Sequence, residues 1–237
     1  MSVRNDMLTE IDNSLGGIPS NYLTGASRDF DIFEGYIFAL LLEEADNVGA
    51  DVLLTDNGGN TPPTTCTFRT GPSSITSSDP YTYAVITFPG RRKPTLEAHI
   101  GVYIAGKSKV RHECDIALIY QTEVEACRQY HRSTSKIALP RSFKVILAIE
   151  CKYYDQDLDI SLARSFIGLV ADCEVDKAFF VTNKASSSPA KLLTKQANQG
   201  KRLSWQPRIY PNPLDDNDVN RIRGLFKDVF NLYLDGQ

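Results

Sequence analysis

Two charged side chains end an apolar run near the middle of the chain. The run covers residues 143–152 and finishes with Glu150-Cys151-Lys152. Because side chains alternate along a β-strand, Glu150 and Lys152 project from the same face of this predicted strand. A carboxylate and an ammonium are costly to place at a buried strand end unless each finds partners. The pair is therefore either a structural ion pair or part of an active site, and other residues must distinguish these alternatives.

A second carboxylate precedes an apolar strand core earlier in the chain. Asp115 lies directly before the apolar residues 116–119, and strand alternation places Glu113 on the same face. If this strand neighbours residues 143–152, Asp115 and Glu150 come close together at the strand ends. The alternative is that Asp115 occupies a solvated strand end. Glu113 is either a further acid beside the site or a solvated side chain.

A third acidic residue falls on the apolar face of a predicted helix. Ser27 is a plausible N-cap for this helix, in which apolar side chains recur at helical spacing. Glu34 lies four residues from both Phe30 and Phe38, so the three side chains share one face. Glu34 therefore either points inward toward a site or lies at the edge of the face, paired with Arg28.

These acidic residues are suited to binding a hard divalent cation. A cluster of two or three carboxylates without a His or Cys partner favours Mg²⁺ or Mn²⁺ over zinc. We expect Asp115, Glu150 and Glu34 to be the ligands of such an ion, which would orient water and stabilise charge on a phosphodiester. Lys152 could position or deprotonate the attacking water and add positive charge near the transition state.

The ordered set resembles the PD-(D/E)XK nuclease superfamily, which has the restriction-endonuclease-like fold. The matching residues are Asp115 within residues 112–116 (HECDI), the motif Glu150-Cys151-Lys152 after the apolar strand, and Glu34 on the first core helix. The sequence departs from the pattern at one point, since Cys114 stands before Asp115 where members often have proline.

Residues 161–169 (SLARSFIGL) resemble the helix that follows the catalytic strand in this superfamily. Its polar residue often contacts phosphate, so the resemblance makes Arg164 a candidate for nucleic-acid binding. The alternative is a surface ion pair between Arg164 and Asp159 or Glu174.

The resemblance covers about residues 28–183 and implies a metal-dependent endonuclease that acts on DNA. It further implies a role in restriction or in defence against foreign DNA, and we expect a homodimer or higher homo-oligomer. An alternative is a catalytically silent member that binds nucleic acid or another protein. A hydrolase of small phosphoesters is a weaker alternative, because the sequence has no glycine-rich phosphate-binding loop.

Basic residues are grouped in several segments that could contact a phosphate backbone. The net charge of −3 gives no overall attraction to nucleic acid, so binding must come from local patches. Lys107, Lys109 and Arg111, at a predicted hairpin turn, are the candidates beside Arg164. Any single basic cluster is also typical of an ordinary solvated surface.

Composition places the chain among ordinary globular proteins. Its 237 residues are 42% hydrophobic and 23% charged, which fits one large domain with a sizeable core. The five cysteines are odd in number and form no CxxC motif, which argues against a disulfide framework and a zinc knuckle. No apolar N-terminal segment or membrane-length run is present, so we expect a cytoplasmic protein without membrane contact.

The order of elements predicts an α/β fold with a mixed central β-sheet flanked by helices, in a restriction-endonuclease-like core. We expect an N-terminal arm or short helix over residues 1–27 and a single domain over 28–237, with a loop insertion at about 56–80. The expected strands cover residues 51–55, 81–88, 96–105, 109–120, 143–152 and 177–182, with a brief extended segment at 208–210. The expected helices cover residues 27–45, 159–170, 189–198 and 215–234, the last capped by Asp215 or Asp218, and residues 121–141 form a helix or loop.

Overall fold

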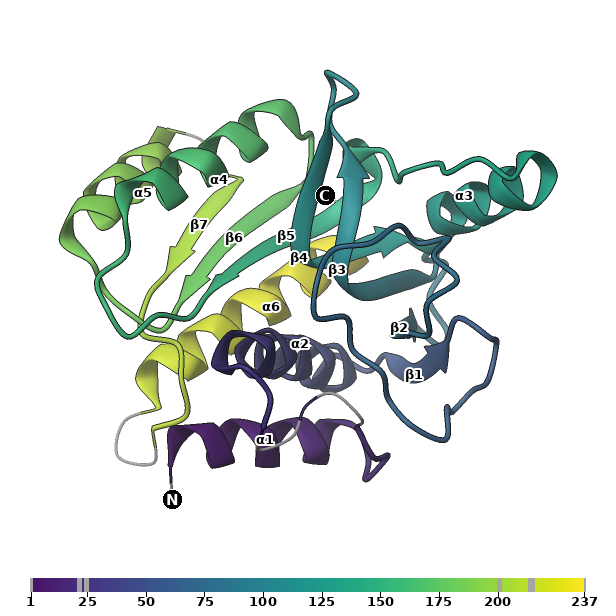
Figure 1. The fold of residues 1–237 in the computed structure, drawn as a ribbon, viewed down its shortest axis with the longest axis horizontal. Coiled ribbons are helices and arrows are strands. Elements are labelled where there is room, and N and C mark those ends of the chain that lie inside the picture. The colour runs from purple at the N-terminus through teal and green to yellow at the C-terminus, as the bar shows by residue number, and fades with distance from the viewer. Residues whose placement is uncertain (1, 21–22, 24–25, 200–201, 213–215, 237) are drawn as a thin grey trace.

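The computed structural model describes residues 2–20, 23, 26–199, 202–212 and 216–236, and a seven-stranded sheet in the order β1 to β7 lies at its centre (Figure 1). The strands are β1 Asp51–Asp56, β2 Thr82–Thr87, β3 Leu96–Ala105, β4 Arg111–Tyr120, β5 Val145–Lys152, β6 Lys177–Thr182 and β7 Leu203–Gln206. The helices are α1 Val3–Ser14, α2 Asp29–Asn47, α3 Gln121–Thr134, α4 Ile160–Asp172, α5 Ser187–Gln199 and α6 Asn217–Asp235.

The sheet is mixed, as the sequence predicts. Strands β1 to β5 pair antiparallel with their neighbours, whereas β5, β6 and β7 run parallel. Parallel neighbours need crossover connections, and α4 and α5 supply these two crossovers. The α/β class with helices flanking a mixed sheet is therefore confirmed.

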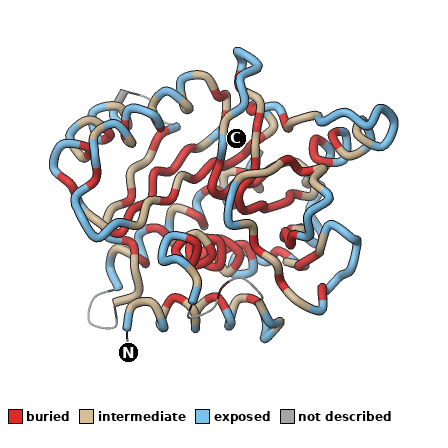
Figure 2. The backbone as a smooth tube through the Cα atoms, in the orientation of Figure 1, coloured by how far each residue is buried: buried red, intermediate tan, exposed pale blue. Residues whose placement is uncertain are grey.

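Two hydrophobic clusters cover the two faces of the sheet. One contains buried residues of α1, α2 and α6, and the other contains buried residues of α4 and α5 (Figure 1). Helix α2 is buried on nearly all sides because it lies between α1, α6 and the sheet (Figure 2). A polar side chain on α2 consequently needs a cleft or a partner.

The hairpin of β3 and β4 bends sharply at Gly101, which lies opposite Asp115. Gly101 has φ +58°, and a Cβ at this position would lie 2.9 Å from the carbonyl oxygen of Gly71. Ile100 packs in the cluster of α2, whereas Val102 packs in the cluster of α4. The bend thus carries the outer half of the hairpin over to the α4 face of the sheet.

The turn of this hairpin is bound to the last residue of α4. The Asp172 carboxylate accepts hydrogen bonds from the Ser108 backbone N–H at 3.0 Å and the Ser108 hydroxyl at 2.6 Å. His112 Nε2 lies 2.7 Å from the same carboxylate. These contacts hold the pKa of Asp172 down at about 2. The turn that carries Lys107 and Lys109 is therefore fixed at the C-terminal end of α4.

Helix starts agree only partly with the capping signals in the sequence. Asp159 caps α4, as expected, by accepting a hydrogen bond from the Ser161 N–H. The prediction of Ser27 as N-cap is wrong, because α2 begins at Asp29 after Arg28, whose side chain makes no cap bond. Asp216 precedes α6, while Asp218 lies inside its first turn, and Asp215 lies outside the described residues.

Two strand boundaries also differ from expectation. Residues 142–144 form a 3₁₀ turn, so β5 begins at Val145 rather than at residue 143. The extended segment predicted at 208–210 is wrong, since β7 lies earlier and Arg208 has φ +59°. The Trp-containing β7 pairs parallel with β6, and its short length left no clear alternation in the sequence.

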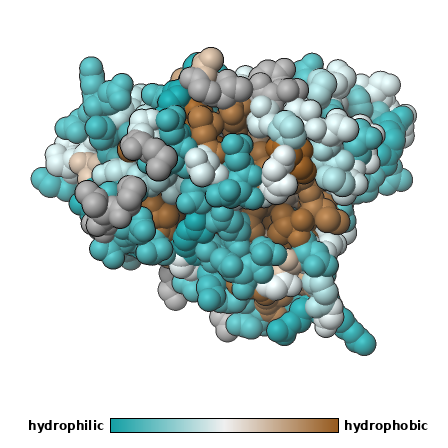
Figure 3. Space-filling model, turned by 90° about the horizontal axis from the view of Figure 1, so that it is seen from below, coloured by the Kyte–Doolittle hydropathy of each residue, from teal (hydrophilic) through white to brown (hydrophobic). Residues whose placement is uncertain are grey.

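The surface seen from below the sheet carries apolar areas broken up by polar side chains (Figure 3). Within the described part of the chain, no helix is long and apolar enough to span a bilayer. The five cysteine side chains are buried free thiols.

Candidate active site

Asp115 and Glu150 lie where strands β4 and β5 separate. The backbone pairing of the two strands extends to the partners Ile116 and Ile149. Beyond that pair, Asp115 Oδ2 accepts a hydrogen bond from the Cys151 N–H at 2.7 Å. A side-chain carboxylate thus continues the contact between the strands at the point where the ladder ends. The predicted proximity of the two strand ends is confirmed.

The Lys152 ammonium lies among three oxygen atoms at this point. Its Nζ is 2.7 Å from Glu150 Oε1, 3.0 Å from the Cys151 carbonyl oxygen and 3.2 Å from Asp115 Oδ2. Burial opposes the charge on Lys152, but Asp115 and Glu150 outweigh this effect and raise its pKa above the ordinary value. Lys152 is therefore a firmly held cation here, which argues against its acting as a proton acceptor.

Glu34 faces the same site from α2. Burial raises its pKa to about 9, and the negative charge of Asp115 adds to the increase while Lys152 opposes it. The alternative partner Arg28 binds Asp31 instead, with Nε and Nη2 at 2.8 and 3.1 Å from the carboxylate oxygens. The inward position of Glu34 is thus the one that the fold adopts.

The pKa values of Glu150 and Glu113 are also raised by nearby negative charge. Burial, followed by the charge of Asp115, raises the pKa of Glu150 to about 7 despite its contact with Lys152. Glu113 is exposed, and partial burial together with Asp115 raises its pKa above the ordinary value. A divalent cation at this site would relieve the repulsion that these pKa shifts reflect.

Three of the acidic side chains, those of Glu34, Glu113 and Asp115, line a cleft of about 370 Å³, here called the central cleft. Its lining includes Glu34, Glu113, Asp115 and Lys152. Arg28, Phe30, Tyr153 and Tyr154 also line the cleft and were not predicted as residues of the site. The tyrosine pair directly after Lys152 was the available signal, since aromatic residues at a strand end often line binding sites.

Metal binding by Asp115, Glu150 and Glu34 stays a prediction. In the described ranges of the chain, no three His, Cys, Asp or Glu side chains are grouped closely enough to hold an ion. The existing cation site is instead made by two carboxylates and the Cys151 carbonyl around the Lys152 ammonium. All three are hard oxygen donors of the kind that Mg²⁺ accepts.

The four basic residues proposed to bind nucleic acid do not line the central cleft. Lys107 forms an ion pair with Glu174 at 2.6 Å, and Lys109 lies in the hairpin turn with φ +64°. Arg111 stacks on Tyr103, with its guanidinium carbon 4.2 Å from the ring centroid. Arg164 is exposed on α4.

Arg164 also bears on the alternative of a surface ion pair. Hydrogen bonds from Ser161 are the main cause of the lowered pKa of Asp159, and the charge of Arg164 contributes to it. Glu174, the other partner considered, binds Lys107. Arg164 is therefore an exposed residue near the start of α4.

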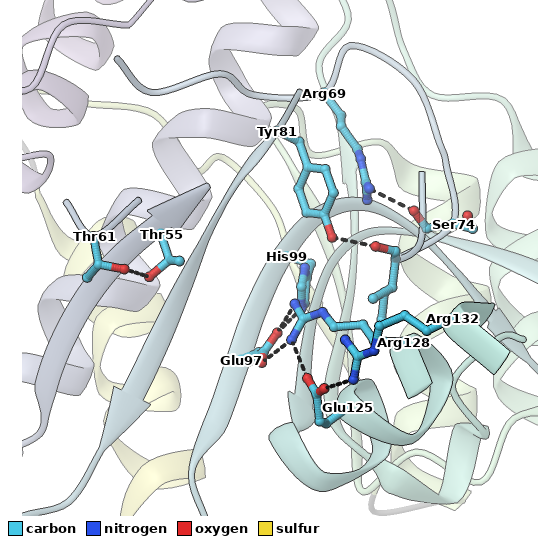
Figure 4. A network of polar contacts seen from close by, with 11 residues as sticks. Thr55, Thr61, Arg69, Ser74, Tyr81, Glu97, His99, Glu125, Arg128 and Arg132 are labelled. Atoms are coloured by element: carbon cyan, nitrogen blue, oxygen red, sulfur yellow. Dashed lines mark hydrogen bonds and ion pairs between the residues drawn. The ribbon is translucent and has the colours of Figure 1, made fainter. Parts of the chain in front are cut away.

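A second group of charged residues, around Glu97 on β3, was not predicted (Figure 4). Glu97 and His99 are completely buried, and Glu97 accepts hydrogen bonds from Arg128 at 2.8 and 2.9 Å. His99 Nε2 lies 3.0 Å from Glu97, and its ring stacks on Tyr83 with centroids 5.1 Å apart. His99 is thus part of this buried group, although its Nδ1 has no hydrogen-bond partner among the described residues.

Neighbouring side chains extend this group to the loop between β1 and β2. Arg69 Nη2 donates a hydrogen bond to the Ser74 carbonyl at 2.7 Å, and the Tyr81 hydroxyl donates one to the Ile75 carbonyl at 2.7 Å. Arg69 also stacks on Tyr81, with its guanidinium carbon 3.5 Å from the ring centroid. The predicted loop insertion is therefore held on the sheet along one wall of the central cleft.

Comparison of the chain with protein-family models, curated proteins and solved structures gave no significant match.

Proposed function

We propose that the protein is a metal-dependent phosphodiester hydrolase that cuts nucleic acid. The observation that carries the proposal is the meeting of Asp115, Glu150 and Lys152 at the separation of β4 and β5, with Glu34 facing them from α2. Three oxygens converge on a cation there, beside an open cleft. Structural ion pairs rarely need a third and a fourth acid at the same place.

The donor atoms at this site suit Mg²⁺ or Mn²⁺. Asp115, Glu150 and the Cys151 carbonyl would hold the ion, and Glu34 would supply a further oxygen. When bound, such an ion supplies Lewis acidity and stabilises the charge that develops on the phosphate. The raised pKa values of Glu34 and Glu150 support this assignment, because a neighbouring cation would relieve the cost of both charges.

The protein's own side chains have distinct tasks in this proposal. Once a metal ion takes over part of the charge of Asp115 and Glu150, the Lys152 ammonium can donate hydrogen bonds to a phosphate oxygen and stabilise its charge. Glu34 has a raised pKa, and a nearby cation would lower that pKa toward about 7. A carboxyl group in that range exchanges protons with water readily.

The finer expectations are proposals that rest on the sequence. The family resemblance implies a restriction-endonuclease-like core, DNA as the substrate, a role in restriction or defence, and Arg164 as a nucleic-acid contact, and a homodimer or higher oligomer is proposed beside them. The cytoplasmic location rests on composition, and Lys107, Lys109 and Arg111 as nucleic-acid contacts rest on the grouping of basic residues.

A second candidate is a catalytically silent protein that binds nucleic acid. The specific observation in its favour is that Lys152 forms ion pairs with both Asp115 and Glu150, and no three acidic side chains of the described residues are grouped closely enough to hold an ion. The Lys152 ammonium thus already occupies the place between the two carboxylates and offsets part of their charge without a metal ion.

Incubation with plasmid DNA, linear DNA, single-stranded DNA and RNA, with Mg²⁺ or with a chelator, separates the two candidates. Hydrolysis supports the first if it requires Mg²⁺ and is lost in Glu150→Gln, which keeps the shape of the side chain. Binding without cleavage of any substrate supports the second. Cleavage that persists in the chelator would overturn the proposed metal dependence.

A further inference from the structure

The central cleft adjoins two further clefts, one on either side. Tyr153 lines both the central cleft and a cleft of about 360 Å³ that also includes Asn183, Lys184 and Arg208. Pro72 lines both the central cleft and a cleft of about 650 Å³ on its other side. We call the three together the long groove. Its middle part contains the acidic residues.

Both ends of the long groove carry positive charge. Lys184 and Arg208, which is paired with Asp218 at 2.9 Å, line one end, and Arg111 lines the other. Between them lie the carboxylates of the central cleft. A chain with an overall charge of −3 thus concentrates cations on both sides of one acidic centre. This distribution suits a linear polyanion whose middle lies at the carboxylates.

Two aromatic side chains beside the acidic centre are open to solvent. Phe30 is 42% exposed and Tyr154 is 41% exposed, and both line the central cleft. The Arg28 guanidinium carbon lies 4.2 Å from the centroid of the Phe30 ring, so a cation and an exposed aromatic ring lie together at this place. Unpaired bases stack on such rings, whereas the bases of a duplex are already stacked on one another.

The walls of the long groove are held in place by hydrogen bonds. Asn183 accepts from the Tyr154 N–H and donates to the Tyr154 carbonyl, both at 2.9 Å, which joins the end of β6 to the tyrosine segment. On the other side, the Ser73 N–H donates to the Gly101 carbonyl at 2.9 Å. A preformed wall of this kind lowers the entropic cost of binding an extended strand.

We propose that the long groove holds a single, extended nucleic-acid strand, with unpaired bases on Phe30 and Tyr154 and phosphates at Lys184 and Arg111. The position of the cut bond at Asp115 and Lys152 rests on the proposed function. The binding of the strand in the groove does not rest on that function. A duplex as the preferred ligand is the alternative that the experiment must exclude.

The test is fluorescence anisotropy with a labelled oligothymidylate of about 12 nucleotides and with a duplex of the same length, in Ca²⁺ at several salt concentrations. We expect the wild type to bind the single strand about tenfold more tightly than the duplex. Lys184→Ala and Arg111→Ala should each weaken this binding about threefold to tenfold and reduce the slope of log affinity against log salt by about 0.7. Lys227→Ala, an equal charge change at an exposed position on α6, should have no effect.

Phe30→Ala should weaken binding of the single strand about fivefold or more and leave duplex binding unchanged. Equal or tighter binding of the duplex would overturn the inference, as would Lys184→Ala and Arg111→Ala variants that behave like Lys227→Ala. Single-strand binding without hydrolysis in Mg²⁺ would leave the groove intact and reject the proposed hydrolysis. Hydrolysis in Mg²⁺ together with unchanged binding in Lys184→Ala and Arg111→Ala would support the proposed hydrolysis and reject binding in the long groove.

Discussion

Glu97 and Glu34 are both acidic side chains enclosed by the fold, and they differ in what surrounds them. Burial raises the pKa of Glu97, but hydrogen bonds and charges from His99 and Arg128 outweigh burial and leave the pKa below its ordinary value. Burial also raises the pKa of Glu34, and there Asp115 increases it further, to about 9. The region around Glu97 is a balanced ion network, whereas that around Glu34 has an excess of negative charge.

This difference separates a region whose charges are paired from one whose charges are not. The Glu97 group binds α3 to β3 (Figure 4), and the Arg128 guanidinium balances the charge of Glu97. The Glu34 site opens into a cleft and gathers several acids around one lysine. A charge imbalance at an accessible place is typical of sites that bind a cation or a reacting group.

The largest difference between the two regions should be in catalysis. We expect Lys152→Met to reduce metal-dependent cleavage by about 10³-fold, because the positive charge beside the phosphate is lost. Initial rates on a labelled substrate measure the effect. Lys227→Met is the matched control and should retain full activity. Wild-type rates in Lys152→Met would reject the assigned role of this lysine.

The next largest effect should be on stability, at the other region. Glu97→Gln leaves Arg128 without a buried counter-charge and should lower the free energy of unfolding by about 3 kcal/mol. Glu125 contacts the same arginine at 3.4 Å but is 50% exposed, so Glu125→Gln should cost less than about 1 kcal/mol. Urea denaturation compares the two variants. Equal losses would show that the Glu97 network is not the stabilising one.

Metal should stabilise one region and leave the other unaffected. With Mg²⁺ or Mn²⁺ at about 100 times the dissociation constant, the native state should gain about 2.7 kcal/mol. Asp115→Asn should lose most of this gain. The Asn oxygen can still accept a hydrogen bond from the Cys151 N–H, so the strand contact is kept. Thermal melting with and without metal, beside the exposed control Asp51→Asn, provides the measurement. The proposed site is incorrect if Asp115→Asn and wild type gain the same stability.

The smallest expected effect concerns the pH dependence of the metal-free protein. Native Glu34 keeps its proton up to about pH 9, whereas an unfolded glutamate loses it near its ordinary pKa of 4.5. The native state therefore binds more protons between these pH values, and stability falls as pH rises through that range. Glu34→Gln should flatten this decline and have a higher free energy of unfolding than the wild type at pH 8. Denaturation at several pH values measures the slope of the free energy of unfolding against pH. The control Asp51→Asn should have the same slope as the wild type.

Sequence rules predicted the acidic site because its residues are placed by local geometry. Strand alternation puts Glu150 and Lys152 on one face, helical spacing turns Glu34 inward, and the adjacency of two strands brings Asp115 to them. The first two rules use residues a few positions apart, and the third needs only that consecutive strands lie side by side. The mixed sheet followed from the same signals.

The missed features depend on contacts between distant segments. Glu97 meets Arg128 only because α3 packs beside β3, and no local pattern identifies that pair. The bend at Gly101 requires the backbone of Gly71 from another loop, and it moves Lys107 and Lys109 to the end of α4. The aromatic and basic lining of the long groove likewise comes from segments that the chain order does not place together.

The hydrogen bond between the Cys151 N–H and Asp115 has a consequence for spectroscopy. The Cys151 nitrogen lies 2.7 Å from the Asp115 Oδ2, so its proton takes part in a short hydrogen bond to a carboxylate and should resonate apart from the protons of ordinary strand amides. Any cation that draws charge from Asp115 weakens this hydrogen bond and shifts the signal. The backbone amide of Cys151 is thus a built-in label for the occupancy of the site, readable in the intact protein without a substrate, a dye or a mutation.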